Sequence, residues 1–63
     1  MKRSALLRFL RRQGCHLKRE GASHSLWTNP LNGLVEAVPR HTEIPDLLAR
    51  KICRGLGVPE IGR

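Results

Sequence analysis

The sequence predicts a small α+β domain in which two helices pack on one face of a three-stranded antiparallel sheet. Three observations predict this fold. Apolar residues recur at helical spacing near both ends of the chain. Between these segments the apolar period changes to two, and turn residues interrupt the chain at short intervals. The expected order of elements is therefore α-β-β-β-α, and the simplest packing is a two-layer domain.

Residues 4–13 are expected to form the first helix, with Ser4 as its N-cap and Gly14 at its end. Its apolar residues fall on one arc of the helical wheel: Leu6, Leu7, Phe9 and Leu10. Its basic residues fall on the opposite arc: Arg8, Arg11 and Arg12. The helix is therefore expected to bury one face and to present a basic face to solvent.

Three segments show strand patterns: residues 15–20, 23–28 and 34–38. In the first of them, alternation places Leu17 and Arg19 on one face, with Lys18 and Glu20 on the other. Turn residues fill the two connections: 21–22 and 29–33. No further segment is available to cover the second face of the sheet, so we expect that face to be polar or to meet a partner.

The second helix is expected to have Pro45 at its first position, Asp46 near the positive end of its dipole, and Gly57 as its cap. Its apolar residues share one face: Leu48, Ala49, Ile52, Cys53 and Leu56. Leu47 falls outside this face and is either exposed or covered by the preceding loop. We expect a single domain over residues 1–63, with a core of about residues 4–58 and a flexible tail at 59–63.

Charge indicates an anionic partner. The 63 residues include twelve Lys or Arg and five Asp or Glu, which gives a net charge of +7. Such a field attracts phosphate chains whatever their sequence. No apolar run approaches the about 20 residues that span a membrane, and arginines interrupt the N-terminal apolar stretch where a signal peptide would be continuous. We therefore expect a cytoplasmic protein that binds no membrane.

Several enzyme classes lack the residues they need. The chain has two cysteines and no Cys-x-x-Cys pair, and Cys15 and His16 would point to opposite faces of a strand. Its glycines form no phosphate-binding loop, and its carboxylates form no obvious catalytic pair. We expect no metal and no cofactor, and we interpret Cys15 and Cys53 as buried apolar residues.

His24 is the strongest candidate for catalysis. It follows a tight turn and has Lys18, Arg19 and Ser23 as neighbours in the sequence. A histidine beside cations can take the proton of a ribose 2′-hydroxyl while the cations hold the phosphate, and this chemistry needs no metal. The alternative is a polar residue beside a turn. We interpret the other two histidines, His41 in a loop and His16 in a strand, more simply as exposed residues without a catalytic role.

The basic residues fall into three groups. One lies on the first helix with Lys2 and Arg3, one comprises Lys18, Arg19 and Arg40 at strand ends, and one lies on the second helix: Arg50, Lys51 and Arg54. Each group is also compatible with an ordinary solvated face. Together they favour contacts to RNA phosphates, because only Phe9 and Trp27 are available for stacking on bases.

In this order the motifs resemble the HicA-type (YcfA-like) family of mRNA interferase toxins, from about Ser4 to Val58. Three segments carry the resemblance: the basic helix and strand leading to Gly21-Ala22-Ser23-His24, then Val38-Pro39-Arg40-His41, and then the helix that opens with Ile44-Pro45 and ends with Ile52-Cys53-Arg54-Gly55-Leu56-Gly57-Val58. The chain departs from the family pattern at Ala22, Glu36, Leu47 and Gly55.

The resemblance implies a fold like that of double-stranded-RNA-binding domains and an endoribonuclease that cleaves mRNA, with a HicB-type antitoxin as partner. It also implies that His24 is the catalytic histidine. From proximity in the sequence, Lys18, Arg19 and Ser23 are expected to contact phosphate. Arg50, Lys51 and Arg54 are expected to add affinity for the RNA backbone. Two alternatives remain: a non-catalytic RNA-binding module of the same fold, and a basic protein that binds an acidic partner.

Overall fold

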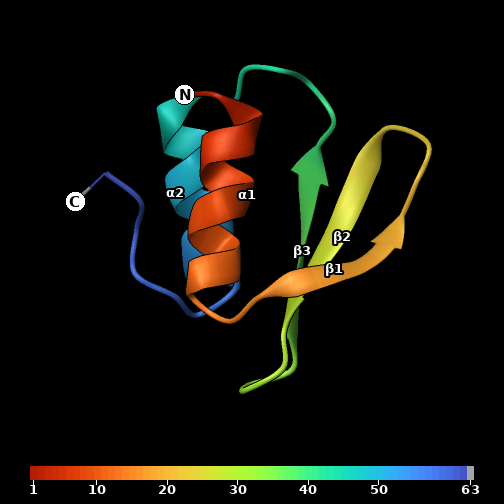
Figure 1. Ribbon diagram of the computed structural model, residues 1–63, viewed down its shortest axis with the longest axis vertical. Coiled ribbons are helices and arrows are strands. Elements are labelled where there is room, and N and C mark those ends of the chain that lie inside the picture. The colour runs from red at the N-terminus through yellow and green to blue at the C-terminus, as the bar shows by residue number, and fades with distance from the viewer. Residues whose placement is uncertain (63) are drawn as a thin grey trace.

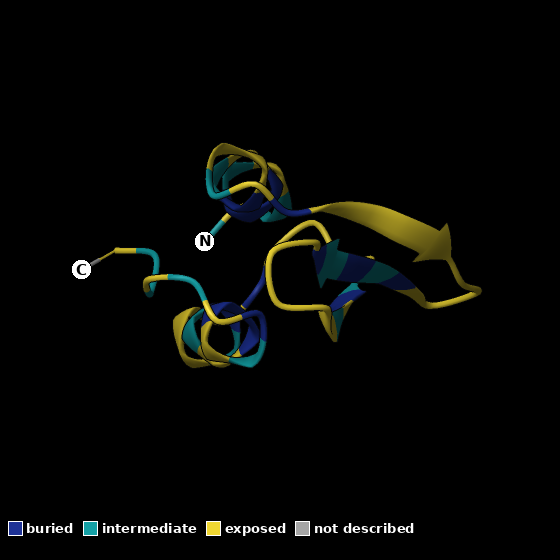
Figure 2. Ribbon diagram, turned by 90° about the horizontal axis from the view of Figure 1, so that it is seen from below, coloured by how far each residue is buried: buried dark blue, intermediate teal, exposed yellow. Residues whose placement is uncertain are grey.

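The computed structural model describes residues 1–62 and contains the five expected elements in the expected order (Figure 1). These are α1 (Arg3–Arg12), β1 (His16–Glu20), β2 (His24–Asn29), β3 (Leu34–Pro39) and α2 (Asp46–Gly55). The strands form one antiparallel sheet in the order β1-β2-β3, and the two helices lie side by side against it (Figures 1 and 2). The predicted α+β fold is confirmed.

The core lies between the helices and the face of the sheet that meets them, which we call the inner face. Its largest side chain is Trp27, at the centre of β2. The buried apolar residues are Leu6, Leu7, Leu10, Cys15, Trp27, Val38, Ile44, Ala49, Ile52, Cys53 and Leu56. By contrast, β1 is exposed along its whole length (Figure 2). The helices therefore leave the inner face of β1 open to solvent.

The helix boundaries differ from the prediction because of a contact distant in sequence. Lys2 occupies the N-cap of α1 and forms an isolated β-bridge with Glu43, and the Arg3 N–H donates to the Thr42 carbonyl at 2.8 Å. The helix thus begins one residue earlier, and the expected capping role of Ser4 is wrong. At the other helix, Pro45 is the N-cap of α2 and precedes its first helical residue.

A β-bulge in β1 overturns the expected alternation. Leu17 pairs with Trp27 and Arg19 pairs with Leu26, so Lys18 is an extra residue between two adjacent pairs. Because paired residues share a face, Leu17 lies on the inner face and Arg19 lies on the opposite, outer face. The bulge therefore separates two residues that simple alternation puts together.

Glu36 and Gly55, both unusual in their positions, explain each other. The pairing of β2 with β3 is continuous and places Glu36 opposite Trp27 on the inner face. There its carboxylate accepts bonds from Lys51 Nζ, at 3.1 Å and 3.3 Å. A Cβ atom at position 55 would overlap the Glu36 side chain. A glycine in α2 therefore makes room for a carboxylate on β3.

The second half of the chain decides between the two alternatives for Leu47 and shows contacts in the tail. Leu47 is 77% exposed, so the preceding loop does not cover it. In the tail, Glu60 forms an ion pair with Arg54 at 2.9 Å, and Ile61 packs against the core. The expectation of a flexible tail at 59–63 also includes Arg63, which lies outside the described residues.

Replacing Gly55 tests its relation to Glu36. An alanine in a helix is favoured over glycine by about 0.5–1 kcal/mol, but here its methyl group must displace the Glu36 side chain from Lys51. We expect Gly55→Ala to stabilise the Glu36→Ala variant by about 0.5 kcal/mol or more and to give no gain in the wild type. Urea unfolding of the wild type, Gly55→Ala, Glu36→Ala and the double variant measures this coupling. An equal change in the free energy of unfolding on adding Gly55→Ala to the wild type and to Glu36→Ala would contradict it.

Both cysteines are free and buried, and burial raises the pKa of each thiol. A thiol that stays neutral in the folded chain but ionises in the unfolded chain lowers stability only above its ordinary pKa of about 8.5. The free energy of unfolding should therefore fall between pH 7 and pH 9.5 by more in the wild type than in Cys53→Ala. Urea unfolding at both pH values measures this difference. An equal fall of the unfolding free energy in the wild type and in Cys53→Ala would show that the Cys53 thiol makes no such contribution.

Candidate nucleic-acid interface

His24 is the first residue of β2 and is exposed at one end of the sheet. Its neighbour Ser25 is buried on the inner face, so His24 lies on the outer face. The Gly21 N–H donates to the His24 carbonyl at 2.8 Å, and a Cβ atom at Gly21 would stand 2.8 Å from that oxygen. The turn thus requires glycine, and it holds the histidine in contact with solvent.

Ser23 lies close to the imidazole ring of His24. The Ser23 Oγ is 3.3 Å from His24 Nδ1, and both residues are exposed. A hydrogen bond at Nδ1 orients the ring and leaves Nε2 available to exchange a proton with a substrate. The structure thus brings together two of the predicted site residues, His24 and Ser23.

Arg40, which belongs to the basic group at the strand ends but not to the predicted site residues, contacts the turn that precedes His24. Its backbone N–H donates to the Ser23 carbonyl at 3.3 Å, and its Nη1 donates to the Gly21 carbonyl at 3.1 Å. The guanidinium therefore lies against the turn that carries His24. Antiparallel pairing could have identified it, because the ladder that pairs His24 with Pro39 places Arg40 opposite Ser23 when it is extended by one residue.

A chain of polar contacts ties α1 to this end of the sheet. Arg3 Nη2 donates to Ser25 Oγ at 2.8 Å, and Ser25 Oγ donates to Glu20 Oε1 at 2.6 Å. Arg3 Nε also donates to the Pro39 carbonyl at 2.8 Å. Ser25 is fully buried, so its hydroxyl joins a cation and a carboxylate where little water can replace it.

The β1 residues predicted to contact phosphate reach this end through the bulge. Arg19 pairs with Leu26, two residues from His24 along β2, so Arg19 and His24 share the outer face. Lys18 is the extra residue of the bulge and is exposed. The bulge thus moves the Arg19 cation to the face on which the histidine lies.

The predicted basic residues of α2 lie apart from His24. Lys51 is paired with Glu36 and Arg54 with Glu60. Asn29 Nδ2 donates to the Leu56 carbonyl at 2.8 Å, which fixes the C-terminal end of α2 at the end of the sheet opposite to His24. Arg50 is half-buried on the same helix.

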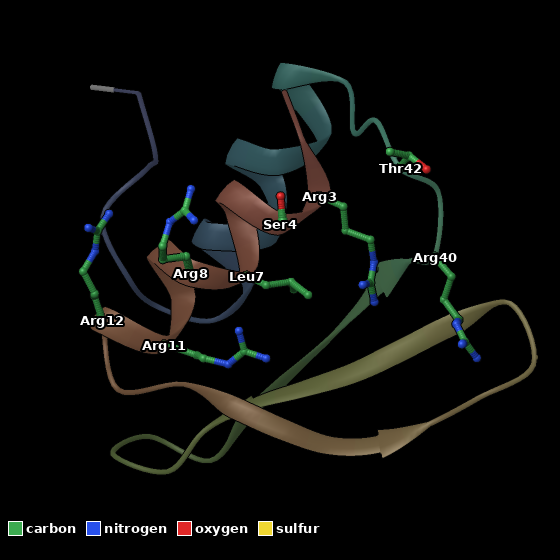
Figure 3. A pocket seen from close by; sticks show the side chains of 8 residues that line it. All are labelled: Arg3, Ser4, Leu7, Arg8, Arg11, Arg12, Arg40 and Thr42. Carbon is green, nitrogen blue, oxygen red and sulfur yellow. The ribbon is translucent and has the colours of Figure 1, made fainter.

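A cavity of about 730 Å³ runs along α1 and the connection between β3 and α2 (Figure 3). We call it the arginine pocket, and it is lined by Arg3, Ser4, Leu7, Arg8, Arg11, Arg12, Arg40 and Thr42. The guanidinium of Arg11 lies 5.1 Å from the centre of the Trp27 ring, a cation–π contact. Five guanidinium groups thus border one cavity, although in the sequence they belong to two different groups, that of the first helix and that of the strand ends.

The other two histidines lack comparable surroundings. His16 pairs with Thr28 on the outer face, and its Nδ1 lies 3.3 Å from the Leu17 carbonyl. His41 is exposed in the connection between β3 and α2. In residues 1–62, no group of three or more His, Cys, Asp or Glu side chains gathers at one place. The same part of the chain contains no helix long and apolar enough to cross a membrane.

Removing the Ser25 hydroxyl tests the polar chain that ties α1 to the sheet. We expect Ser25→Ala to lower the free energy of unfolding by about 1–2 kcal/mol, because Arg3 and Glu20 both lose a buried partner. The same change at the exposed Ser23 is the matched control and should cost no more than about 0.5 kcal/mol. Equal losses of unfolding free energy in the two variants, measured in urea, would mean that this series of polar contacts adds nothing to stability.

Comparisons of the chain with models of protein families, with curated proteins and with solved structures find no match. The functional conclusion therefore depends on the site itself. Its two parts are the exposed His24 with Ser23 and Arg40 at one end of the sheet, and the arginine pocket beside α1.

Proposed function

We propose that the chain is a metal-independent endoribonuclease that cleaves mRNA, as the HicA-type resemblance implies. The observation that carries the proposal is the position of His24. It is an exposed imidazole held by a glycine turn, against which Arg40 places a guanidinium. The site thus has a proton acceptor and a phosphate ligand at one end of the sheet. The nucleophile is the 2′-hydroxyl of the RNA substrate itself.

The proposed reaction uses the ribose 2′-hydroxyl of the substrate. His24 removes the proton of that hydroxyl, and the oxygen attacks the adjacent phosphorus atom. The O2′–P bond forms and the P–O5′ bond breaks, which yields a 2′,3′-cyclic phosphate and a 5′-hydroxyl that takes its proton from water or from the histidine. Ser23, beside the imidazole, and Arg19, on the same face of the sheet, would hold the phosphate and stabilise its developing charge, and Arg40 would contact the RNA strand where it passes the turn.

The remaining predicted residues would have a smaller role. Lys18, exposed in the bulge, would add a phosphate contact at the edge of the site. Lys51 and Arg54 are paired with carboxylates at a distance from His24, so with Arg50 they would contribute mainly to long-range attraction of RNA. An mRNA substrate would require a cytoplasmic location, and a HicB-type antitoxin with an acidic surface would complement the charge of the protein.

A non-catalytic RNA-binding module of the same fold is the second candidate. The arginine pocket favours it, because five guanidinium groups can bind a phosphate chain whether or not the chain is cut. Cleavage separates the two functions, since only the first candidate requires His24 to exchange a proton.

The test is cleavage of a long single-stranded RNA in EDTA. The wild type should cleave, and His24→Ala should lose about 10²–10⁴-fold in rate, which is the usual contribution of a positioned acid–base group. His41→Ala, purified in the same way, is the matched control and should retain the wild-type rate. A contaminating nuclease would also be detected, because it would cleave the RNA at a similar rate in the His24→Ala and His41→Ala preparations.

Two results would reject the proposed function. Full activity in His24→Ala would remove the catalytic assignment, and loss of wild-type activity in EDTA would remove the metal-independent mechanism. RNA binding without cleavage by any of the proteins would favour the binding module.

A further inference from the structure

The arginine pocket carries more positive charge than its surroundings balance. Arg8, Arg11 and Arg12 form no ion pair with any residue in 1–62, and Arg3 donates to a hydroxyl and a carbonyl. One carboxylate approaches the group, that of Glu20, at 3.9 Å from Arg40 Nη1. The other ion pairs involve residues outside the pocket.

This charge works against the stability of α1. The helix contains no acidic residue, and Arg8 lies three and four positions from Arg11 and Arg12, where like charges repel. Arg3 adds a cation at the N-terminal end, which the helix dipole disfavours. The helix dipole favours Arg11 and Arg12 in the last turn, so the unfavourable contributions are the repulsion from Arg8 and the position of Arg3, and a bound anion would offset both.

We infer that the arginine pocket binds the phosphodiester backbone of single-stranded RNA. This inference rests on the proposed function and extends it to substrate binding. Guanidinium groups pair with phosphate oxygens through two parallel hydrogen bonds, and the Ser4 and Thr42 hydroxyls add neutral donors to the same cavity. Arg40 borders the pocket and also contacts the turn of His24, so a strand that leaves the pocket past Arg40 arrives at the histidine.

The length of the pocket indicates how much RNA it holds. Arg3 and Arg12 are nine residues apart, which is about 14 Å along a helix axis. A stacked strand advances about 3.4 Å per nucleotide, so the pocket would follow roughly four nucleotides. A volume of about 730 Å³ is larger than one phosphate group needs and lies within the range of about 300–1,000 Å³ for pockets that enclose whole small molecules.

Trp27 provides a direct signal for occupancy of the pocket. It is the only tryptophan of a chain without tyrosine, and the guanidinium of Arg11 lies over its ring. An anion that draws Arg11 away from the ring changes the surroundings of this one fluorophore. Binding can therefore be followed without cleavage and without a label.

The experiment titrates the full chain with a 2′-O-methyl oligoribonucleotide, which has no free 2′-hydroxyl and cannot be cleaved by the proposed reaction. The pocket variant is Arg8→Gln with Arg12→Gln. The matched control is Lys51→Gln with Arg54→Gln, which removes the same number of charges from α2. We expect the pocket variant to weaken binding about tenfold or more, and the control to weaken it by less than about threefold.

Salt dependence and chain length give two further results. Loss of two phosphate contacts should lower the slope of log K against log salt by about 1.4 in the pocket variant, at about 0.7 for each contact to a single strand. Affinity in the wild type should rise with oligonucleotide length up to about four nucleotides and then more slowly.

Three outcomes would overturn the inference. Equal losses in the pocket variant and the control would show a general field effect without a pocket. Stronger binding of polyglutamate than of the oligonucleotide would identify an acidic protein segment as the ligand. An unchanged salt slope in the pocket variant would show that Arg8 and Arg12 do not contact phosphate. His24→Ala should bind the oligonucleotide with the affinity of the wild type, because the inferred contacts lie in the pocket. If the wild type binds through the pocket but does not cleave RNA, the proposed function is rejected and the inference about the pocket stands.

Discussion

The alternation of buried side chains along β2 is the constraint on which the rest of the structure depends. Ser25, Trp27 and Asn29 all point to the inner face and are buried there. Trp27 fills the core, Ser25 connects α1 with β1, and Asn29 holds the end of α2 through the Leu56 carbonyl. Because side chains alternate along a strand, this burial directs His24 to the outer face at the end of the same strand. The position of the candidate catalytic residue thus follows from the packing of its neighbours.

A chain of 63 residues has little stability to spare, because a domain of this size buries only about 60% of its unfolded surface. In this context the uneven distribution of charge is informative. The exposed cations Lys51 and Arg54 of α2 are matched by Glu36 and Glu60, whereas the arginines of α1 line one cavity without a carboxylate on their own helix. Stability alone would favour carboxylates among them. Their absence from α1 is consistent with the phosphate ligand that we infer for the arginine pocket.

The sequence predicts the fold well because its signals are local. Helical and strand periods, together with glycine at the turns, indicate all five elements and their order. Within the site, the same local signals identify His24 and Ser23, since the two residues are adjacent and follow the turn at Gly21. What lies close along the chain could thus be recognised from residue types and spacing.

The remaining features depend on contacts between distant segments. The bulge at Lys18 arises when β1 pairs with β2, and no residue in the sequence marks it. Ser4 resembles a helix cap, but the β-bridge from Lys2 to the β3–α2 connection sets where α1 begins. The arginine pocket could not be predicted, because its lining combines a helix face with Arg40 from the end of the third strand. Tertiary pairing decides each of these features, and single-sequence patterns do not contain it.

The two parts of the candidate interface lie on different sides of the sheet, and this arrangement has a consequence for control. The pocket lies beside α1, whereas His24 is on the outer face, and Arg40 contacts both regions at the same end of the molecule. An RNA strand that uses both must therefore bend around that end. A protein that covers either region would then interrupt the path. An acidic antitoxin would not need to reach the histidine, because filling the arginine pocket would remove the proposed anchoring of the strand, on which the proposed cleavage would depend.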